Sequence, residues 1–374
     1  MKKDNRPPIS TLACTNPHCQ DHGLPGKDNL RVIREYGKHD SIRYLKCNSC
    51  KTCFSERKNT PLWNARLPEA EVACIAEHLS DRCSYKSSAR LTKHSKNTIK
   101  HYAKRIGYHA RDVHNQLVQD VQVNALEFDE RHGFFQTKTN KLWEANAIDP
   151  KSKFMLELTF GTRTEDQIKS LMVNTKKRLL QITDLLVMTD GLSSYNSLFP
   201  EVFGVPYAIP RSRKQRLSGR KQKFKQVIPR GVALLQLVKQ YKGNRVVGVD
   251  ERLTFGSKKT LNKGLKRLGY QTGNTSAIER FNGTNRGMNA FQVRKGLSFA
   301  RRTESRVVMG WLVACVYNWC RVNRAVRVKL EKAVGRRLFE DRTPAMAIGL
   351  ASRVWSVLDL LRVQVFARKL VGSV

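Results

Sequence analysis

The stretch that decides the fold of this 374-residue chain is Leu185-Leu-Val-Met-Thr-Asp-Gly191 (LLVMTDG). A short, continuous apolar run of this kind is typical of a strand that is buried on both faces of a sheet. Asp190 ends the run, and an acid at the end of a buried strand is costly unless it is paired or binds a metal ion. The segment therefore predicts a central strand that delivers a functional carboxylate.

The sequence before this strand predicts the rest of a mixed sheet. Residues 121–128 (VQVNALEF) alternate like a half-buried strand and deliver Asp129 near its end. Residues 141–148 and 154–160 have strand-like patterns, and residues 164–180 have the pattern of a helix. Two strands of this sheet thus each present an aspartate.

A third acid is predicted on a helix that starts near Ser276. Glu279, Asn282 and Arg286 recur at i, i+3 and i+7, so they share one helix face. Carboxylates from two strands and a helix suit a pair of Mg²⁺ (or Mn²⁺) ions, which clamp the attacking and leaving oxygens in phosphoryl transfer. Spacing alone does not single out three residues among 31 acids.

A cysteine cluster near the start of the chain indicates a structural zinc ion. Two close pairs fit a tetrahedral four-thiolate site, with the strand-like segments 30–36 and 41–46 forming a hairpin between them. Cys53 gives a competing pair with Cys50, but it precedes Phe54, which we expect in the hairpin core. The predicted zinc ligands are therefore Cys14, Cys19, Cys47 and Cys50.

The next segment has the pattern of a helix-turn-helix. One helix is predicted to begin at Pro68, a second to cover residues 87–92, and a third to run over 96–106, capped by Ser95 and ended by Gly107. An ordinary basic helical bundle would have a similar pattern. As a recognition helix in the major groove, the third helix would present Lys96, Asn97, Lys100, Lys104 and Arg105 to DNA.

The overall charge points to a polyanionic partner. Lys and Arg number 69 against 31 Asp and Glu, so the formal net charge is +38. The sharpest run, residues 210–230, contains no acid and predicts either a solvated linker or a phosphate-contacting surface. The DNA contacts we expect there are Arg211, Arg213, Lys214, Arg220 and Lys221.

Other classes of protein fit the sequence poorly. No apolar run is long enough to suggest a membrane span, and the first ten residues, MKKDNRPPIS, have no apolar segment like that of a signal peptide. The nine cysteines then suggest thiols or metal ligands in a reducing compartment, not a disulfide framework. These features predict a cytoplasmic, nucleoid-associated protein.

Three blocks of sequence carry a more specific signal. They are FDERHGFFQTKTNKLWEANAID (128–149), LVMTDGLSSYNSLFP (186–200) and IERFNGTNRGMNAFQVRKGLSFARRTE (278–304). In this order they resemble the three catalytic blocks of the DDE transposases of the insertion-sequence-one family. The cysteine ribbon and the following helices also resemble the DNA-binding part of that family. The resemblance covers roughly residues 10–205 and 275–320.

The resemblance implies an α+β multidomain chain with a ribonuclease-H-like catalytic domain. It implies a two-metal catalytic site made of Asp129, Asp190 and Glu279, with Arg286 near the site and in contact with DNA. Glu130 follows Asp129 on a strand, so its side chain points the other way. The parts would be a zinc ribbon (10–60), a helix-turn-helix (67–118), a catalytic core (121–205 and 274–323), a basic insertion (206–273) and a basic helical tail (324–374).

The chain departs from the family in one spacing. Sixty residues separate Asp129 from Asp190, but 88 separate Asp190 from Glu279, and short members of the family have a much smaller second gap. The extra length coincides with the basic insertion, and the sequence does not say whether that insertion folds. Glu251 is the rival third acid, although it lacks the Asn and Arg context of Glu279.

These features predict a transposase that binds terminal inverted repeats, cleaves the transposon end and joins the freed 3′-OH to target DNA. Its partners would be double-stranded transposon ends and target DNA, and coordinated cleavage of two ends implies a homodimer or larger assembly. Two alternatives stay open, a non-catalytic DNA-binding regulator derived from a transposase and a structure-specific nuclease.

Overall fold

The apolar run of the decisive segment is a central strand. In the computed structural model of the protein, β9 (Leu185–Asp190) is buried except at its last residue, as predicted. The structure describes residues 6–218, 221–243, 245–293 and 296–366. These residues form a mixed α/β architecture of two units, which are treated separately below.

The two units are interleaved in the sequence. Unit 1 draws its described residues from 1–117, 286–321 and 353–374. Unit 2 draws its residues from 118–285 and 322–352. The helix α8 (Ser276–Met288) begins in unit 2 and has its last residues in unit 1.

Unit 2 is organised around a mixed sheet. Among the described residues this sheet has six strands in the order β13-β12-β9-β4-β7-β8, and β4 is parallel to β9 but antiparallel to β7. The strand β12 is also parallel to β9, and β8 and β13 add antiparallel edges. The other strands of the sheet are β4 (Ala125–Arg131), β7 (Trp143–Ile148), β8 (Met155–Gly161), β12 (Val232–Lys242) and β13 (Arg245–Phe255).

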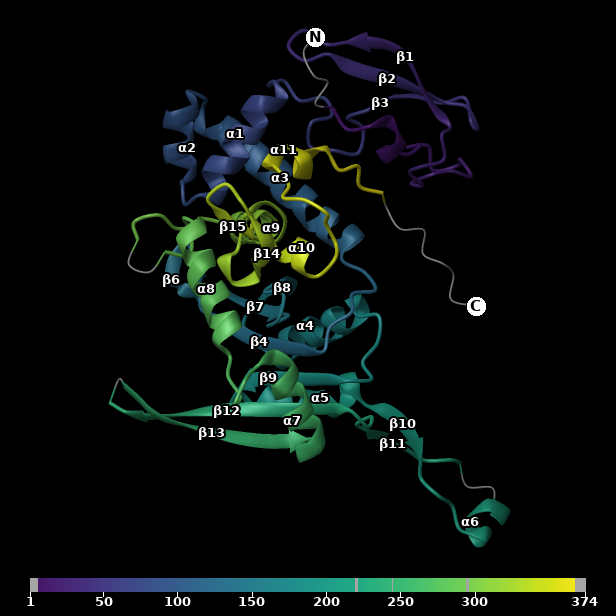
Figure 1. Ribbon diagram of the computed structural model, residues 1–374, viewed down its shortest axis with the longest axis vertical. Helices are drawn as coiled ribbons and strands as arrows, with labels where there is room; N and C mark the ends of the chain where they lie inside the picture. Colours follow the sequence, from purple (N-terminus) through teal and green to yellow (C-terminus); the bar gives the residue numbers. More distant parts are fainter. Residues whose placement is uncertain (1–5, 219–220, 244, 294–295, 367–374) are drawn as a thin grey trace. The chain divides into compact units, whose positions relative to one another are not determined.

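Helices pack on both faces of this sheet. On one face, Tyr195 of α5 (Ser193–Phe203) stacks on Phe128, and α4 (Glu165–Arg178) packs beside α5. On the other face, Leu265 of α7 (Lys258–Leu268) joins a core cluster with Ala125 and Met188. Figure 1 shows α7 beside β9 and β12. The small hairpin β5 (Phe134–Phe135) and β6 (Thr137–Lys141) was not predicted.

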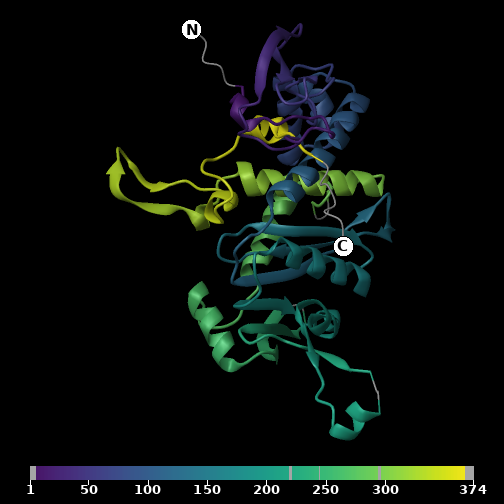
Figure 2. The same cartoon turned by 90° about the vertical axis from the view of Figure 1, so that its right-hand side faces the viewer.

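The sequence predicts that residues 206–273 are a basic insertion. Only part of this stretch is an insertion in the structure. Its second half supplies β12 and β13, because the buried run Val232–Leu237 pairs in parallel with β9. Its first half forms an antiparallel ribbon, drawn with α6 at its tip in Figures 1 and 2. The elements of that ribbon are β10 (Val205–Ala208), α6 (Arg213–Leu217) and β11 (Phe224–Val227).

Unit 1 contains the cysteine ribbon and three helices that follow it. The ribbon sheet has the order β1-β2-β3, and a 3₁₀ turn, Ile9–Thr11, precedes it. Its strands are β1 (Leu30–Tyr36), β2 (Ile42–Cys47) and β3 (Cys53–Ser55), and the helices are α1 (Glu69–Ser80), α2 (Tyr85–Thr92) and α3 (Lys96–Leu117).

The predicted end of the third helix is wrong. The helix α3 continues through Gly107 to Leu117. A Cβ atom at position 107 would lie 2.4 Å from the Cβ and the carbonyl oxygen of Val308. Gly107 is therefore present because α9 (Thr303–Cys315) packs closely there, and it does not act as a helix stop.

Two further boundaries differ from the prediction. Residues 286–321 belong to unit 1, whereas the sequence had assigned 274–323 to the catalytic core, because α9 buries its apolar face against α3. The tail 324–374 is not wholly helical, since an alternating sequence and a turn at Gly335 give a hairpin, β14 (Val328–Val334) and β15 (Arg337–Glu340). The remaining elements are a π-helical turn (Val316–Cys320), a 3₁₀ turn (Arg324–Val326), α10 (Pro344–Ala347) and α11 (Val357–Arg362).

Within the described ranges, no helix combines the length and the apolar character that crossing a membrane requires.

Candidate active site and zinc centre

A row of polar side chains crosses one face of the sheet in unit 2. The register pairs Ala125 with Leu186, which places Asp129 beside Asp190 on neighbouring parallel strands. Side chains alternate along a strand, so Asp129 and Asp190 share the face on which α7 packs. Asn146 of β7 is paired with Asp129 and extends the row. Both aspartates are half-buried.

The helix α8 is tied to this row by hydrogen bonds. Asn282 donates from Nδ2 to Oδ2 of Asp129 at 2.6 Å, and its Oδ1 accepts from Nδ2 of Asn146 at 3.3 Å. One turn earlier, the backbone N–H of Ile278 donates to Oε2 of Glu127 at 2.7 Å. The start of α8 is thus fixed over β4, within reach of Asp129.

Glu279 lies on this part of α8 and is exposed, with its side chain 50% accessible. Its carboxylate pairs with the ammonium of Lys239, which comes from β12, and accepts from Oγ1 of Thr275 at 3.1 Å. The sequence did not single out Lys239, Asn146 or Glu127. Strand pairing brings Lys239 and Asn146 to this site, whereas Glu127 shares the face of Asp129 because it lies two residues earlier on β4.

The acids of this face repel one another. Burial raises the pKa of Asp129 to about 6, and the charges of Asp190 and Glu279 add to the rise. Burial raises the pKa of Glu127 to about 7, against the hydrogen bond from Ile278. The pairing with Glu279 raises the pKa of Lys239. A cation bound among these carboxylates would therefore be favoured.

Glu130 points to the opposite face, as its position beside Asp129 on the strand predicts. It is buried, accepts a hydrogen bond from the hydroxyl of Tyr195, and pairs with Arg163 at 3.2 Å. Burial raises the pKa of Glu130 to about 7, although the hydrogen bond from Tyr195 opposes the rise. These contacts give Glu130 a structural partner on the α5 side.

Glu251, the rival third acid, lies on β13 opposite Leu237. Leu237 in turn is paired with Asp190, so Glu251 is two strands away from Asp190, or about 10 Å at the usual strand spacing. Its Oε1 accepts from the backbone N–H of Gly273 at 2.8 Å. Glu279 has the more direct connection to Asp129, through its own helix and Asn282.

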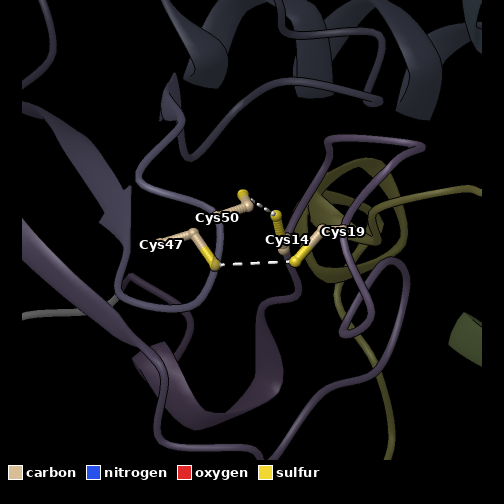
Figure 3. A group of neighbouring side chains, drawn as sticks. All are labelled: Cys14, Cys19, Cys47 and Cys50. Atoms are coloured by element: carbon tan, nitrogen blue, oxygen red, sulfur yellow. Dashed lines mark hydrogen bonds between the residues drawn. The ribbon is translucent and has the colours of Figure 1, made fainter.

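The cysteines form a tighter cluster than these acids. Among the described residues, they are the one group of three or more His, Cys, Asp or Glu residues whose ligand atoms all lie within 4.8 Å of one another. The Sγ atoms of Cys14 and Cys50 are 3.6 Å apart, and those of Cys19 and Cys47 are 3.9 Å apart (Figure 3). Four thiolates at about 2.3 Å from a tetrahedral Zn²⁺ would lie about 3.8 Å apart, which fits these distances.

Groups around the cysteines also suit bound metal. The backbone N–H of Asp21 donates to Sγ of Cys19 at 3.4 Å, and Nδ2 of Asn29 lies 3.6 Å from Sγ of Cys47. Such donors orient thiolate ligands and stabilise their charge. Cys53 is exposed and outside the cluster, while Phe54 is buried in it, as predicted. The group of four cysteines can therefore hold a structural metal such as zinc.

The predicted recognition helix is amphipathic in the expected sense. Its buried face contains Ile99, Tyr102 and Ile106. Lys96, Asn97, Lys100 and Lys104 are exposed, and Arg105 is half-buried. Lys104 pairs with Glu304 of α9 at 2.7 Å, and Arg105 donates to the carbonyl oxygen of Trp63. The last two side chains thus also have contacts within unit 1.

The other predicted DNA contacts are spread over the chain. Arg213 and Lys214 lie on α6 and are exposed, Lys221 is exposed, and Arg211 is half-buried. Arg220 lies outside the described residues. Arg286 lies in the last turn of α8 and belongs to unit 1. A role of these residues in DNA binding stays a prediction.

Comparisons with known proteins leave the family open. The chain matches no protein-family profile and no curated protein. Among solved structures it is similar to a chain of the piggyBac transposase synaptic complex with hairpin DNA, with 12% sequence identity and a TM-score of 0.31. The match covers 79% of this chain and 69% of that chain.

Proposed function

We propose that the protein is a DNA transposase of an insertion sequence, with its catalytic site at Asp129, Asp190 and Glu279. One observation carries the proposal: two aspartates stand side by side on parallel strands, and Asn282 anchors the Glu279-bearing helix to the first of them. Asn282 of the third resembling block thus contacts Asp129 of the first, and Asp190 of the second block lies on the neighbouring strand.

The sheet supports a ribonuclease-H-like core for this site. Three antiparallel strands, β4, β7 and β8, are followed through α4 by β9 and then β12, both on the other side of β4. In this order the carboxyl end of β9, which carries Asp190, lies beside β4, which carries Asp129. That arrangement suits a site that receives a DNA strand at the edge of the row.

The donor set fits divalent metal ions. Carboxylate oxygens are the ligands that Mg²⁺ and Mn²⁺ prefer. The pKa of Asp129 is raised first by burial and then by the charges of Asp190 and Glu279, which a cation would neutralise. Two Mg²⁺ ions held by Asp129, Asp190 and Glu279 would activate a nucleophile and stabilise the leaving oxygen in phosphodiester cleavage and strand transfer. Asp129, in the middle of the row, would be a ligand of this metal site.

The residues around these acids have distinct roles in the proposal. Asn282 holds the carboxylate of Asp129 in one orientation, and Asn146 in turn holds Asn282. Leu192 donates its N–H to Oδ1 of Asp190 at 3.0 Å and fixes that carboxylate. If Glu279 held a metal ion, the ammonium of Lys239, which now pairs with Glu279, would be available to a DNA phosphate.

The DNA partners would be held by other basic elements. The helix α3, with Lys96, Asn97 and Lys100, would read the terminal inverted repeats, and the ribbon β10–β11 with α6 would hold flanking or target DNA through phosphates. The segment of β10, α6 and β11 carries no acidic residue between positions 205 and 230. Bringing two transposon ends together would require at least a homodimer. The protein would act in the cytoplasm, at the nucleoid.

Cleavage of end-containing DNA tests the proposal. The full-length protein is mixed with Mg²⁺ and a duplex carrying the inverted repeats expected beside its gene, and nicked and joined products are measured. Asp190→Asn and Glu279→Gln should each abolish cleavage and leave duplex binding unchanged. Glu251→Gln is the matched control and should cleave normally.

The other outcomes assign a different function. Binding of the ends without cleavage by the wild-type protein would identify a regulator, and cleavage without joining would identify a nuclease. If Glu279→Gln kept full cleavage activity and Glu251→Gln lost it, the third catalytic carboxylate would be Glu251 on β13 and not Glu279.

A further inference from the structure

Aromatic and basic side chains gather on the outer face of the cysteine ribbon. The strand register places Arg34 opposite Tyr44 and Tyr44 opposite Ser55, so a row of side chains crosses all three strands. Leu45 and Phe54 alternate with this row and pack with the cysteines on the inner face. The outer row is therefore not needed to build the zinc centre.

Two of the aromatic rings pack edge-to-face there, and a guanidinium lies over one of them. The rings of Tyr36 and Tyr44 lie 6.0 Å apart at 88°, and Cζ of Arg34 lies 5.0 Å from the centre of the Tyr44 ring. Tyr36 is 41% exposed and Trp63, from the segment after β3, is 44% exposed. Large aromatic side chains at this exposure are costly to leave in water, which indicates a surface for binding.

These side chains line one open pocket of about 340 Å³. Cys53, Phe54 and Ser55 of β3 also line it, and no acidic residue is among its lining residues. We refer to it as the ribbon pocket, and its characteristic residues are Arg34, Tyr36, Tyr44, Lys58, Trp63 and Asn64.

The backbone of Trp63 is held in place. Its carbonyl oxygen accepts a hydrogen bond from the Arg105 guanidinium of α3, and its N–H donates to the carbonyl oxygen of Thr60 at 3.2 Å. Asn64 follows with a positive φ of 53°, which turns the chain back at the pocket. The backbone that carries the exposed indole is thus held at the pocket, where a flat ligand can stack on the ring.

We infer that the ribbon pocket binds an unpaired base of a single-stranded nucleic acid. Nucleobases stack on aromatic rings and on guanidinium planes, and Lys58 supplies positive charge for the adjoining phosphate. Asn64, which lines the pocket, offers a donor and an acceptor for the edge of the base. In an intact duplex the base faces are already stacked, so the pocket fits an extruded or single-stranded nucleotide. The inference goes beyond the proposed transposase function and does not use the carboxylate site.

Paired oligonucleotides can separate base stacking from charge attraction. Oligothymidylate is compared with an abasic oligonucleotide of the same length, without Mg²⁺ and at about 0.5 M salt, where phosphate contacts are weakened. We expect the wild-type protein to bind the thymidylate at least about tenfold more tightly. Tryptophan fluorescence should be quenched by thymidylate and not by the abasic strand.

Variants of the full chain locate the effect. Trp63→Leu and Tyr36→Leu should each reduce the preference for bases to near unity, while Trp63→Phe should keep the preference and lose most of the quenching. Tyr241→Leu removes an aromatic ring that is 63% exposed in unit 2, and it should change neither reading. Retained zinc in each variant shows that the ribbon is folded.

Three results would overturn the inference. An equal affinity of the wild-type protein for the two strands excludes base stacking. A preference that survives both Trp63→Leu and Tyr36→Leu places the base elsewhere. A dimer that Trp63→Leu dissociates, with no quenching by thymidylate, would make the pocket a contact between two copies of the chain. None of these results depends on catalysis, so a failure here is distinct from a failure of the proposed function.

Discussion

Asn282 and Asp129 are joined by a 2.6 Å hydrogen bond between residues 153 positions apart in the chain. The bond fixes the helix that carries Glu279 to the central strand that carries the first aspartate. The orientation of the Asn282 amide is itself defined, because Asn146 donates to its oxygen and Arg131 lies 3.5 Å from the oxygen of Asn146. The site thus has a supporting layer of amides, whatever ligand the carboxylates bind.

Replacing Asn282 should damage catalysis without removing a carboxylate. Asn282→Leu keeps the approximate volume but removes the hydrogen bond, and loss of such an orienting partner costs about 10–100-fold in activity or metal affinity. A hydrogen bond to the charged form lowers a pKa, so its loss should raise the pKa of Asp129 and shift the acid limb of the pH–rate profile upward. The cleavage rate and its pH profile are the measurements.

Gln240→Leu is the control for this variant. It breaks another hydrogen bond between an amide and a carboxylate, that of Gln240 with Asp250, on the exposed part of β12 and β13. We expect wild-type cleavage and an unchanged pH profile. An unshifted profile in Asn282→Leu would mean that the amide does not orient Asp129 in the active complex.

The raised pKa of Asp129 also predicts a gain in stability on removing its charge. Its folded-state pKa of about 6 lies above the ordinary value of 3.8, so between these pH values the folded state binds more protons than the unfolded state. The stability contributed by this group therefore falls as the pH rises through this window, and the full cost is present at pH 7.5. Asp129→Asn should then be more stable than the wild type by roughly 1–2 kcal/mol at pH 7.5.

Thermal unfolding without added Mg²⁺ measures this difference. The advantage of Asp129→Asn should shrink near pH 4, where the wild-type carboxyl is already protonated. Added Mg²⁺ should raise the melting temperature of the wild type and not that of the variant. A variant that is less stable than the wild type at pH 7.5 would contradict the electrostatic account of this site.

The cysteine cluster predicts a sharp contrast between two neighbouring thiols. Cys47→Ser removes a buried ligand, so the protein should lose its zinc and the ribbon should unfold, because metal binding and folding are coupled in such sites. Cys53→Ser changes an exposed thiol outside the cluster and should keep one zinc per chain. Metal content by atomic emission and resistance to proteolysis are the measurements. Loss of zinc in Cys53→Ser would instead support the competing ligand set.

Local features of the sequence were predicted well because their causes are local. The ribbon strands, the cluster of four cysteines and β9 follow from spacing, alternation and apolar runs, and the structure has them close to the expected residues. The two aspartates were found for the same reason, since each follows an apolar strand. The role of Glu279 rested on resemblance, and the structure adds only its nearness to Asp129.

Features that depend on distant partners were not predicted. The run Val232–Leu237 is apolar, yet a basic neighbourhood hid it, and only its pairing with β9 reveals a strand of the core. Asn146 and Asn282 meet because β7 lies beside β4, which no spacing in the sequence states. The hairpin of β14 and β15 was obscured by its charge in the same way.

Gly107 is a clear case in which a residue normally read as a helix stop is required by packing. Gly107→Ala would place its Cβ 2.4 Å from the carbonyl oxygen and 2.7 Å from the Cα of Val308, so the contact between α3 and α9 must open. Overpacking of this kind costs about 1–3 kcal/mol.

Gly287→Ala is the control for this variant. Gly287 lies in the last turn of α8, also in unit 1, and a Cβ atom there meets no atom within 4 Å, so the substitution should stabilise the protein by about 0.5 kcal/mol through helix propensity. Because backbone atoms of Val308 make the clash, Val308→Ala should not restore the stability of Gly107→Ala. Thermal unfolding of Gly107→Ala, Gly287→Ala and the double variant Gly107→Ala/Val308→Ala measures the change in stability of each. A Gly107→Ala protein as stable as Gly287→Ala would mean that α3 and α9 do not pack this closely.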